Sequence, residues 1–204
     1  MCGDIDIRNS VTQFYELENC TVVEGHVKIV LIDNGTAKDF ANLTFPRLRE
    51  ITDYFLLFRI MGLQSLKRLF PNLAVIRGRT LLDNYALVVY EMLHLQEIGL
   101  TSLTDIVRGD VRIEKNPNLC FVDTVDWSRI ARNSLIILNK APAACPTCNE
   151  TCPVVSARRS DGAIIGDING RVCWTDEVCQ KYCKCFGEKG FNSILTWLYL
   201  SYSF

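Results

Sequence analysis

The sequence predicts a mainly β protein: a solenoid of stacked repeats, capped by short helices and followed by a small disulfide-rich segment. One pattern recurs four times, in which apolar and polar residues lead to a turn residue and then to a β-rich segment. The turn residues are Gly25, Asp53, Gly78 and Gly109, which lie 28, 25 and 31 positions apart. Repeats of this length are typical of solenoids, because one coil cannot bury its apolar face alone and stacks on the next. A protein of this kind usually works by presenting a surface to a partner.

Length, charge and motifs limit the classes of function. The chain has 204 residues, enough for one domain and a small second unit, and 49% of them are hydrophobic, which suffices for a core. The formal net charge is −1, so neither nucleic acid nor an acidic membrane is predicted as a partner. No Gly-rich phosphate loop, kinase catalytic-loop motif or metal-binding His cluster occurs, and we expect His26 and His94 to be structural. The chain is therefore predicted not to be an enzyme and to need no cofactor.

Short helices are predicted at both ends of the solenoid. Residues 9–20 predict a capped helix, because Ser10 and Gln13 have the spacing of a capping box. The segment 123–132 predicts a short closing helix, and its Trp127 can plug the far end of the solenoid. Such caps are expected because the exposed ends of a solenoid must be covered.

The solenoid itself is predicted from about residue 21 to residue 120. Two connectors within it, Phe45-Pro46-Arg47-Leu48 and Phe70-Pro71-Asn72-Leu73, lie 25 residues apart. Proline fixes φ and starts a turn, and the following Leu can point inward to begin the next coil. Near residue 144, cysteines and short loops replace periodic apolar residues, and we place a domain boundary there.

Strand alternation within the repeats separates inward from outward side chains. Positions two and four after each turn residue are mostly apolar and should face the core, whereas positions three and five should face out. The apolar outward residues are Val30, Leu56, Phe58 and Leu81. An exposed apolar patch is typical of an interaction site, although a flanking loop or the first helix would equally well cover it. The inward set is Val27, Ile29, Phe55, Leu57, Thr80, Leu82, Val111 and Ile113, and the other outward residues are Lys28, Asp83, Arg112 and Glu114.

Cysteine density marks the C-terminal part of the chain. Ten cysteines are present and seven fall in the last 60 residues, which indicates a disulfide scaffold in an oxidising compartment. Sequons for N-glycosylation agree with that compartment and occur at Asn19, Asn34, Asn42 and Asn149. No signal peptide is visible, so we expect a fragment or an incomplete gene model. The apolar stretch 191–204 spans 14 residues, fewer than the roughly 20 that a membrane span needs.

Many segments of the chain resemble, in order, one receptor family. Among them are Ile51-Thr52-Asp53-Tyr54, Asn84-Tyr85-Ala86-Leu87-Val88 and Arg112-Ile113-Glu114-Lys115-Asn116. They are similar to the first leucine-rich-like L domain of insulin and insulin-like growth factor receptors, and the resemblance extends over about residues 2–185 into the start of the cysteine-rich region. It implies a single-stranded right-handed β-helix. It also implies a receptor L domain over residues 1–144, the start of a furin-like cysteine-rich region over 145–185, and an unmatched apolar tail over 186–204.

The resemblance further implies a role in hormone binding. In that family the L domain is extracellular and supplies half of the primary site for an insulin-like peptide hormone, while the C-terminal segment of the receptor α-chain packs on the same face. The full-length parent would be a cell-surface receptor tyrosine kinase that forms a homodimer. Asp33 and Asp83 stand where close vertebrate relatives can carry aromatics, so we expect an invertebrate-type hormone or weakened binding. Carried onto matching positions, the site consists of Asp6, Arg8, Asn9, Lys28, Val30, Leu31, Leu56, Phe58, Arg59, Leu81, Leu82, Asn84, Tyr85, Val88, Tyr90, Glu91, Arg112, Glu114 and Lys115.

The family pattern also implies how the cysteines pair. Cys179 should bond to a cysteine between Cys152 and Cys173, and this sequence has none there. Cys145 is an additional cysteine by the same comparison, so we predict that it bonds to Cys179 instead. The other pairs that the resemblance implies are Cys2–Cys20, Cys120–Cys148 and Cys152–Cys173.

Two other functions stay open at this point. Cys145 and Cys148 have C-x-x-C spacing, and Cys183 and Cys185 would complete four thiolates for zinc, although disulfides fit the neighbouring cysteines better. Alternatively, a chain that ends after the first domain would be a secreted decoy that sequesters insulin-like peptides. The sequence names neither the particular hormone nor its affinity.

Overall fold

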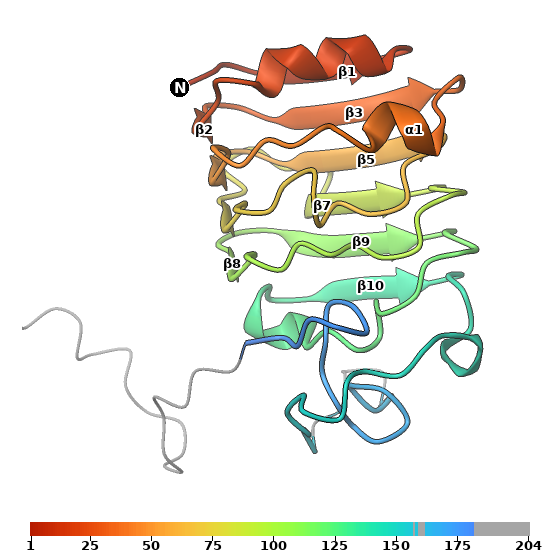
Figure 1. The fold of residues 1–204 in the computed structure, drawn as a ribbon. Coiled ribbons are helices and arrows are strands. Elements are labelled where there is room, and N and C mark those ends of the chain that lie inside the picture. Colours follow the sequence, from red (N-terminus) through yellow and green to blue (C-terminus); the bar gives the residue numbers. More distant parts are fainter. Residues whose placement is uncertain (157, 159–161, 182–204) are drawn as a thin grey trace, which may run out of the picture.

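Two parallel β-sheets form the framework of the computed structural model, which describes residues 1–156, 158 and 162–181. The large sheet has six strands and the small sheet has four, and the chain alternates between them so that successive repeats stack (Figure 1). The mainly β prediction is therefore confirmed. In spatial order the large sheet contains β1 (Ile5–Arg8), β3 (Val27–Ile32), β5 (Phe55–Ile60), β7 (Tyr85–Tyr90), β9 (Asp110–Glu114) and β10 (Ser134–Ile137). The small sheet contains β2 (Val22–Val23), β4 (Glu50–Ile51), β6 (Val75–Ile76) and β8 (Asp105–Ile106).

A short helix closes the N-terminal end of the stack. The 3-10 helix η1 (Val11–Leu17) begins after Ser10, whose hydroxyl accepts a hydrogen bond from the backbone N–H of Thr12 at 3.2 Å. Phe14 and Leu17 are fully buried, and the Phe14 ring lies 5.8 Å from that of Phe40 in helix α1 (Ala37–Phe40). A helix capped by Ser10 is confirmed, and it covers the end of the stack beside β1 (Figure 1). The predicted capping box does not form, because Oε1 of Gln13 accepts from the backbone N–H of Arg8 and not from that of Ser10.

The C-terminal end is closed by less helix than the sequence predicted. Only the 3-10 helix η2 (Trp127–Arg129) forms within residues 123–132, and η3 (Pro142–Ala144) follows later. Gln180 Nε2 donates to the backbone carbonyl oxygen of Asp126 at 3.2 Å, so a contact with the cysteine-rich segment engages the acceptor that a longer α-helix would offer to the N–H of Ile130. Trp127 still plugs the end, because it is buried edge-to-face against Trp174 with ring centroids 5.6 Å apart. None of the described helices is long and apolar enough to cross a membrane.

Strand alternation builds the core as predicted in three of the four repeats. Val27 and Ile29, Phe55 and Leu57, and Val111 and Ile113 are all fully buried. The parallel register pairs Val27 with Phe55, so equivalent side chains of successive repeats stack in continuous rows. Each such side chain contributes about 1.5–3 kcal/mol relative to leaving it in water. The rows fix which side chains face out.

The third repeat departs from the predicted alignment. Its long strand begins at Tyr85, because residues 79–84 form a loop before it, and Leu82 and Tyr85 close that loop by bonding to each other. Leu87 and Val89 therefore fill the core positions that the alignment gave to Thr80 and Leu82, which are exposed and half-buried respectively. Gly78 itself does mark the turn: its φ is 64°, and an added Cβ would lie 2.1 Å from the Arg108 carbonyl oxygen.

Four disulfides join the described cysteines, and three of the four differ from the prediction. Cys2–Cys20 is confirmed, with Cα atoms 5.5 Å apart. Cys145 is not additional: the chain returns from β10 and places it beside Cys120, with Cα atoms 5.5 Å apart. Each later pairing consequently moves by one cysteine. Cys145 and Cys148, two of the four thiols proposed for zinc, are both in disulfide bonds. The observed bonds are Cys120–Cys145, Cys148–Cys173 and Cys152–Cys179, in place of Cys120–Cys148, Cys152–Cys173 and Cys145–Cys179. Cys183, Cys185 and the tail lie outside the described residues.

Candidate binding face on the large sheet

The outward side chains of the large sheet stand in three rows that run across its strands, and we call this surface the outer face. The rows exist because neighbouring strands pair in parallel register, with one bulge between Tyr85 and Leu87. From β1 to β10, the first row is Asp6, Lys28, Leu56, Val88, Arg112 and Leu135, and the second is Arg8, Val30, Phe58, Tyr90, Glu114 and Ile137. The third row holds the residue after each second-row residue: Asn9, Leu31, Arg59, Glu91, Lys115 and Leu138.

The centre of the outer face is apolar and aromatic. Leu56 and Phe58 on β5 are half-buried, and the Phe58 ring lies 5.6 Å from that of Tyr90 on β7. Val30 and Val88 face out but are only 5% exposed. Each stands between two longer side chains of its row: Val30 between Arg8 and Phe58, and Val88 between Leu56 and Arg112. The first helix does not cover this patch, since its buried residues pack into the end of the core. The centre is thus an apolar surface on rigid strands.

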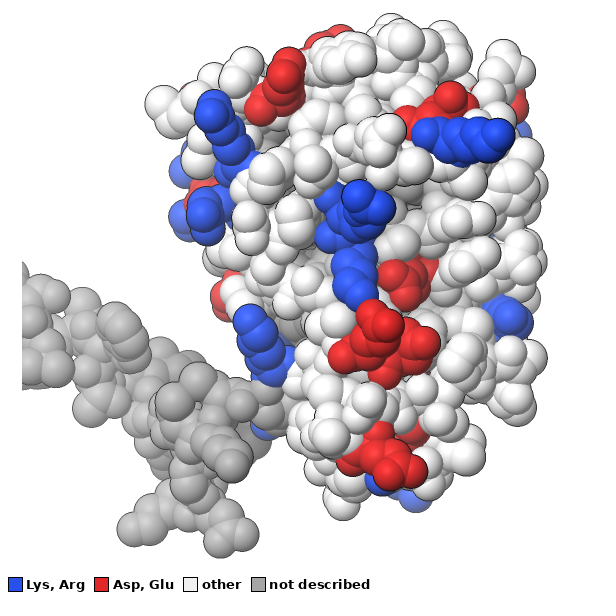
Figure 2. Space-filling model, viewed as in Figure 1, with Lys and Arg blue, Asp and Glu red and all other residues white. Residues whose placement is uncertain are grey.

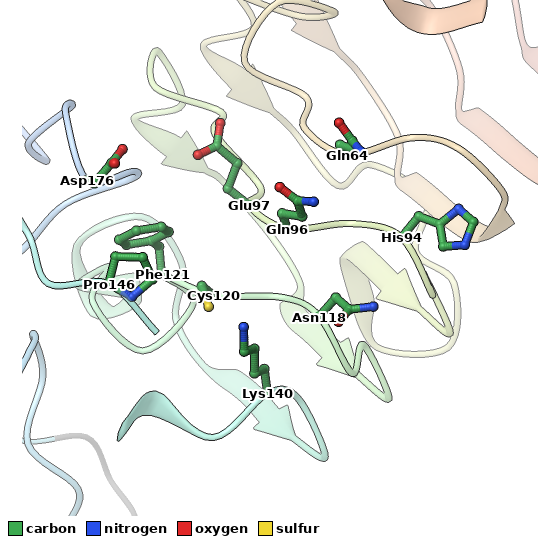
Figure 3. Close-up of a pocket in the computed structure, with 10 residues that line it drawn as sticks. All are labelled: Gln64, His94, Gln96, Glu97, Asn118, Cys120, Phe121, Lys140, Pro146 and Asp176. Carbon is green, nitrogen blue, oxygen red and sulfur yellow. The ribbon is translucent and has the colours of Figure 1, made fainter. Parts of the chain in front are cut away.

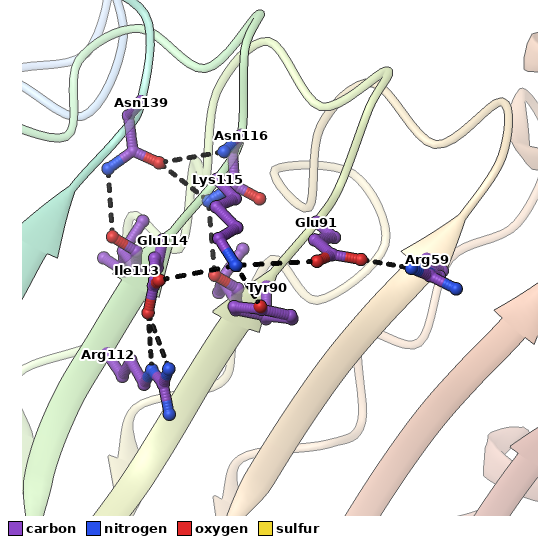
Figure 4. Close-up of polar contacts among 10 residues, drawn as sticks. Arg59, Tyr90, Glu91, Arg112, Ile113, Glu114, Lys115, Asn116 and Asn139 are labelled. Carbon is purple, nitrogen blue, oxygen red and sulfur yellow. Dashed lines mark hydrogen bonds and ion pairs between the residues drawn. The ribbon is translucent and has the colours of Figure 1, made fainter.

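A charged network borders the apolar centre on the β9 side (Figure 4). Arg112 donates from Nε and Nη2 to one carboxylate oxygen of Glu114, at 2.9 and 2.6 Å. Lys115 donates to the Tyr90 hydroxyl at 2.7 Å and lies 3.9 Å from both Glu91 and Glu114. The Glu114 carboxylate raises the pKa of Arg112, and the Tyr90 hydroxyl raises that of Lys115. These contacts hold the long side chains in fixed directions beside the aromatic ring.

The network continues back to β5 through the third row. Arg59 donates from Nε to Glu91 at 2.7 Å, and this hydrogen bond is the main cause that lowers the pKa of Glu91. The Arg59 guanidinium also lies 5.1 Å from the centre of the Phe58 ring, within the range of cation–π attraction. The aromatic centre and the charged border are therefore in direct contact.

A second charged group borders the centre on the β1 side. The Asp6 carboxylate accepts from Arg8 at 2.6 Å and lies 2.9 Å from the Lys28 ammonium. The Arg8 hydrogen bond, helped by Lys28, lowers the pKa of Asp6 to about 2. Over the whole outer face, five cationic side chains stand against three carboxylates, although the chain as a whole has a net charge of −1. The face therefore favours a partner with acidic groups around an apolar contact.

Every residue of the third row has a left-handed backbone. The φ angles of Asn9, Leu31, Arg59, Glu91, Lys115 and Leu138 are 61°, 57°, 49°, 51°, 60° and 57°. None is glycine, and this conformation costs an ordinary residue roughly 1–2 kcal/mol. Such strain persists only where surrounding structure fixes it, and it is frequent at binding sites. The row turns the chain sharply at the end of each long strand and forms one border of the outer face.

Comparison with known proteins identifies the family. The family model described as "Receptor L domain" matches residues 19–131, more than half of the chain. The chain belongs to the receptor L domain family. It is 50% identical over 195 residues to the insulin-like peptide receptor of Branchiostoma lanceolatum, which covers 92% of this chain and 14% of that protein. It is 50% identical to the Xenopus laevis insulin-like growth factor 1 receptor over 189 residues and 47% identical to the Xenopus laevis insulin receptor over 188 residues. Each of these two matches covers 90% of this chain and 14% of the relative.

The similarity places this receptor L domain with the insulin and insulin-like growth factor receptors. The chain spans 14% of the length of these curated relatives. Whether this chain takes part in the activity of such whole receptors is therefore a matter for proposal.

The structure brings most of the predicted site residues of this receptor L domain onto the outer face. Tyr85 adjoins it, with its ring centre 5.7 Å from the Arg112 guanidinium. Leu81, Leu82 and Asn84 do not join the rows, because they lie in the loop before β7, and Leu81 packs partly against the core. The members that do lie in the rows are Asp6, Arg8, Asn9, Lys28, Val30, Leu31, Leu56, Phe58, Arg59, Val88, Tyr90, Glu91, Arg112, Glu114 and Lys115.

The sequence missed the sixth strand of the outer face. Leu135, Ile137 and Leu138 extend the three rows over β10 and are 36%, 43% and 66% exposed. The segment Ser134–Ile137 lacks the Gly or Asp turn that marks the other repeats, which is why the repeat pattern passed over it. The apolar run itself was the one available signal.

Proposed function

We propose that this receptor L domain is the extracellular ligand-binding portion of an insulin-like peptide receptor. Its outer face would supply the L-domain half of the primary hormone site in receptor tyrosine kinase signalling. One observation carries the proposal: Leu56, Phe58 and Tyr90 form a half-buried apolar centre on paired strands, left partly open by the described residues, with charged groups fixed on both sides. Buried aromatic and aliphatic anchors within a polar rim are the usual arrangement at a tight peptide interface.

The partners follow from the same surface. An insulin-like peptide would contact the apolar centre, and the C-terminal segment of the receptor α-chain would share the face, as the family resemblance implies. The excess of positive charge would guide acidic groups of either partner to the rim, where such pairs affect encounter rate more than affinity. The rest of a homodimeric receptor, the cell-surface location and the right-handed winding of the repeats belong to this proposal.

A direct titration tests the proposal. The full chain would be titrated with an insulin-like peptide, with and without the C-terminal α-chain peptide of the Branchiostoma relative. We expect weak binding to the chain alone and tighter binding with the peptide. Phe58→Ala should lower the affinity by about 2 kcal/mol or more, roughly thirtyfold, as expected for a central aromatic anchor.

The control is Tyr15→Ala, since Tyr15 is 69% exposed on η1 and lies off the outer face. It should leave the affinity unchanged. Absence of binding in both arms would contradict the function, and unchanged binding after both Phe58→Ala and Arg112→Ala would contradict the choice of face.

A further inference from the structure

A polar cavity lies away from the outer face, where the repeats meet the cysteine-rich segment, and we call it the junction cavity (Figure 3). Its volume is about 680 Å³, within the range of small-ligand sites. Turns after β5, β7 and β9 form one side, and residues 140, 146 and 176 form the other. The lining consists of Gln64, His94, Gln96, Glu97, Asn118, Cys120, Phe121, Lys140, Pro146 and Asp176.

The lining has hydrogen-bonding capacity that the described part of the chain leaves unused. The side-chain amides of Gln64 and Gln96 have no partner among the described residues, and neither Lys140 nor Asp176 forms an ion pair there. Glu97 accepts one hydrogen bond, from Ser65 at 2.7 Å. Donors and acceptors of both kinds therefore face one space. A ligand rich in hydroxyl groups suits it, because each hydroxyl can both donate and accept.

A glycosylation sequon stands at the rim of the junction cavity. The backbone N–H of Asn149 donates to the carbonyl oxygen of Asp176 at 3.0 Å, and Asp176 lines the cavity. Asn149 is exposed, and its Oδ1 accepts from the backbone N–H and the hydroxyl of Thr151 at 2.9 and 2.7 Å. The carboxamide oxygen is thus held by the sequon threonine. The free end of the carboxamide is Nδ2, the atom to which a glycan is attached.

The other three sequons lie elsewhere. Asn19 follows η1 and accepts a hydrogen bond from Arg47 at 3.3 Å, while Asn34 and Asn42 flank α1. No residue of any of the four sequons itself lines the junction cavity. Only Asn149 among the four is bonded to a residue of that lining.

We propose that Asn149 carries an N-linked glycan whose first sugars fold back into the junction cavity. In the coupling step, Nδ2 of Asn149 attacks the anomeric carbon of an oligosaccharide carried on a lipid pyrophosphate. The bond from that carbon to the pyrophosphate oxygen breaks, the lipid pyrophosphate leaves, and Nδ2 loses one proton. The first N-acetylglucosamine units then hydrogen-bond to Gln96, Glu97 and Lys140, with Pro146 against their apolar face.

The glycan would act as a brace between the repeats and the cysteine-rich segment. Phe121, which lines the cavity, has a left-handed φ of 62° and is only 9% exposed, so the chain is fixed tightly at this corner. A sugar chain bonded to side chains from both parts would oppose their separation. Its loss would lower stability without any contact with the outer face.

The experiment is a double-mutant cycle on protein from glycosylating cells. Mass spectrometry before and after enzymatic removal of N-glycans would first give the occupancy of each sequon. We expect Asn149→Gln to lower Tm by roughly 2–4 °C, the shift typical of one modest interaction in a chain of this size. Asn42→Gln is the control and should not lower Tm. Gln96→Ala, at an exposed side chain without a described partner, should lower Tm in glycosylated protein and leave it unchanged in the Asn149→Gln background.

Each outcome is decisive. An unmodified Asn149 overturns the inference, as does a Gln96→Ala shift of equal size in both backgrounds. The inference depends on passage through the secretory pathway, which belongs to the proposed function, but it does not depend on hormone binding. Modification of Asn19 with an empty Asn149 therefore defeats the inference alone, whereas four empty sequons on native protein would also count against the extracellular location.

Discussion

The side-chain amide of Asn116 donates a hydrogen bond to Oδ1 of Asn139 at 2.8 Å and joins the turns that follow β9 and β10 (Figure 4). Asn116 is fully buried, its Oδ1 accepts from the backbone N–H of Met92 at 2.9 Å, and its Nδ2 also donates to the carbonyl oxygen of Val89 at 3.2 Å. One side chain thus satisfies backbone groups of the preceding repeat and binds the following one.

We predict that Asn116→Ala lowers the free energy of unfolding by about 2–4 kcal/mol, because it leaves buried backbone groups without partners. Denaturant unfolding would measure this. The matched control is Asn118→Ala, since Asn118 is exposed and makes one hydrogen bond, to the Leu93 carbonyl oxygen at 2.7 Å. That variant should lose no more than about 1 kcal/mol. Equal losses in the two variants would show that Asn116 does not hold the repeats together.

Asp6 predicts an acid-sensitive contribution to stability. Its pKa is about 2 in the folded protein, below the ordinary value of 3.8, chiefly because of Arg8. A lowered folded pKa stabilises above the unfolded pKa, and the gain is lost as pH falls from about 4 through 2. Asp6→Asn should therefore be less stable than the natural chain at pH 6 and converge with it at pH 2. The difference should be below about 1 kcal/mol, because the carboxylate is 36% exposed and such pairs are screened. A difference that stays constant with pH would be inconsistent with this account.

The sequence predicted those parts of the fold that depend on local chemistry. Gly25 and Gly109 mark turns with positive φ, and the alternation after them buries Val27 and Val111 as expected. The strand position predicted for the third repeat was wrong, because the turn residue does not determine the length of the loop that follows it. Gly78 turns the chain, yet six further residues precede β7.

The third row of the outer face had almost no sequence signal. A left-handed conformation is ordinarily marked by Gly or Asn, and only Asn9 among its residues is of that kind. Leu31 adopts it between β1 and β5, and Leu138 adopts it after the edge strand β10, beside β9. In both places the neighbouring repeats hold the backbone, which is a property of the stack. Three predicted disulfide pairs were wrong for a related reason, since pairing depends on which cysteines the folded chain brings close together.

Leu138 offers a test of the strain in that row. It has φ 57° and is 66% exposed, so it loses little packing when shortened. Glycine adopts this conformation without a Cβ clash, and we predict that Leu138→Gly raises the free energy of unfolding by about 0.5–1 kcal/mol. The control, Ile137→Gly, lies within β10 and should lower it by about 1 kcal/mol, because glycine weakens a strand. Urea unfolding would compare them, and destabilisation by both changes would argue against strain at Leu138.

The observed disulfides make a prediction that separates them from the pairing implied by the family pattern. Replacing both partners of a true bond creates no new free thiol, whereas replacing one partner from each of two bonds creates two. Cys152→Ser with Cys179→Ser should therefore leave the free-thiol content unchanged, and Cys145→Ser with Cys179→Ser should add two thiols, at Cys120 and Cys152. Thiol titration in denaturant and non-reducing peptide mapping would measure this. Two new thiols in the first double variant and none in the second would instead support the Cys145–Cys179 bond. Loss of the Cys152–Cys179 bond, which closes a loop of separation 27, should also cost about 3–4 kcal/mol through the greater freedom of the unfolded chain.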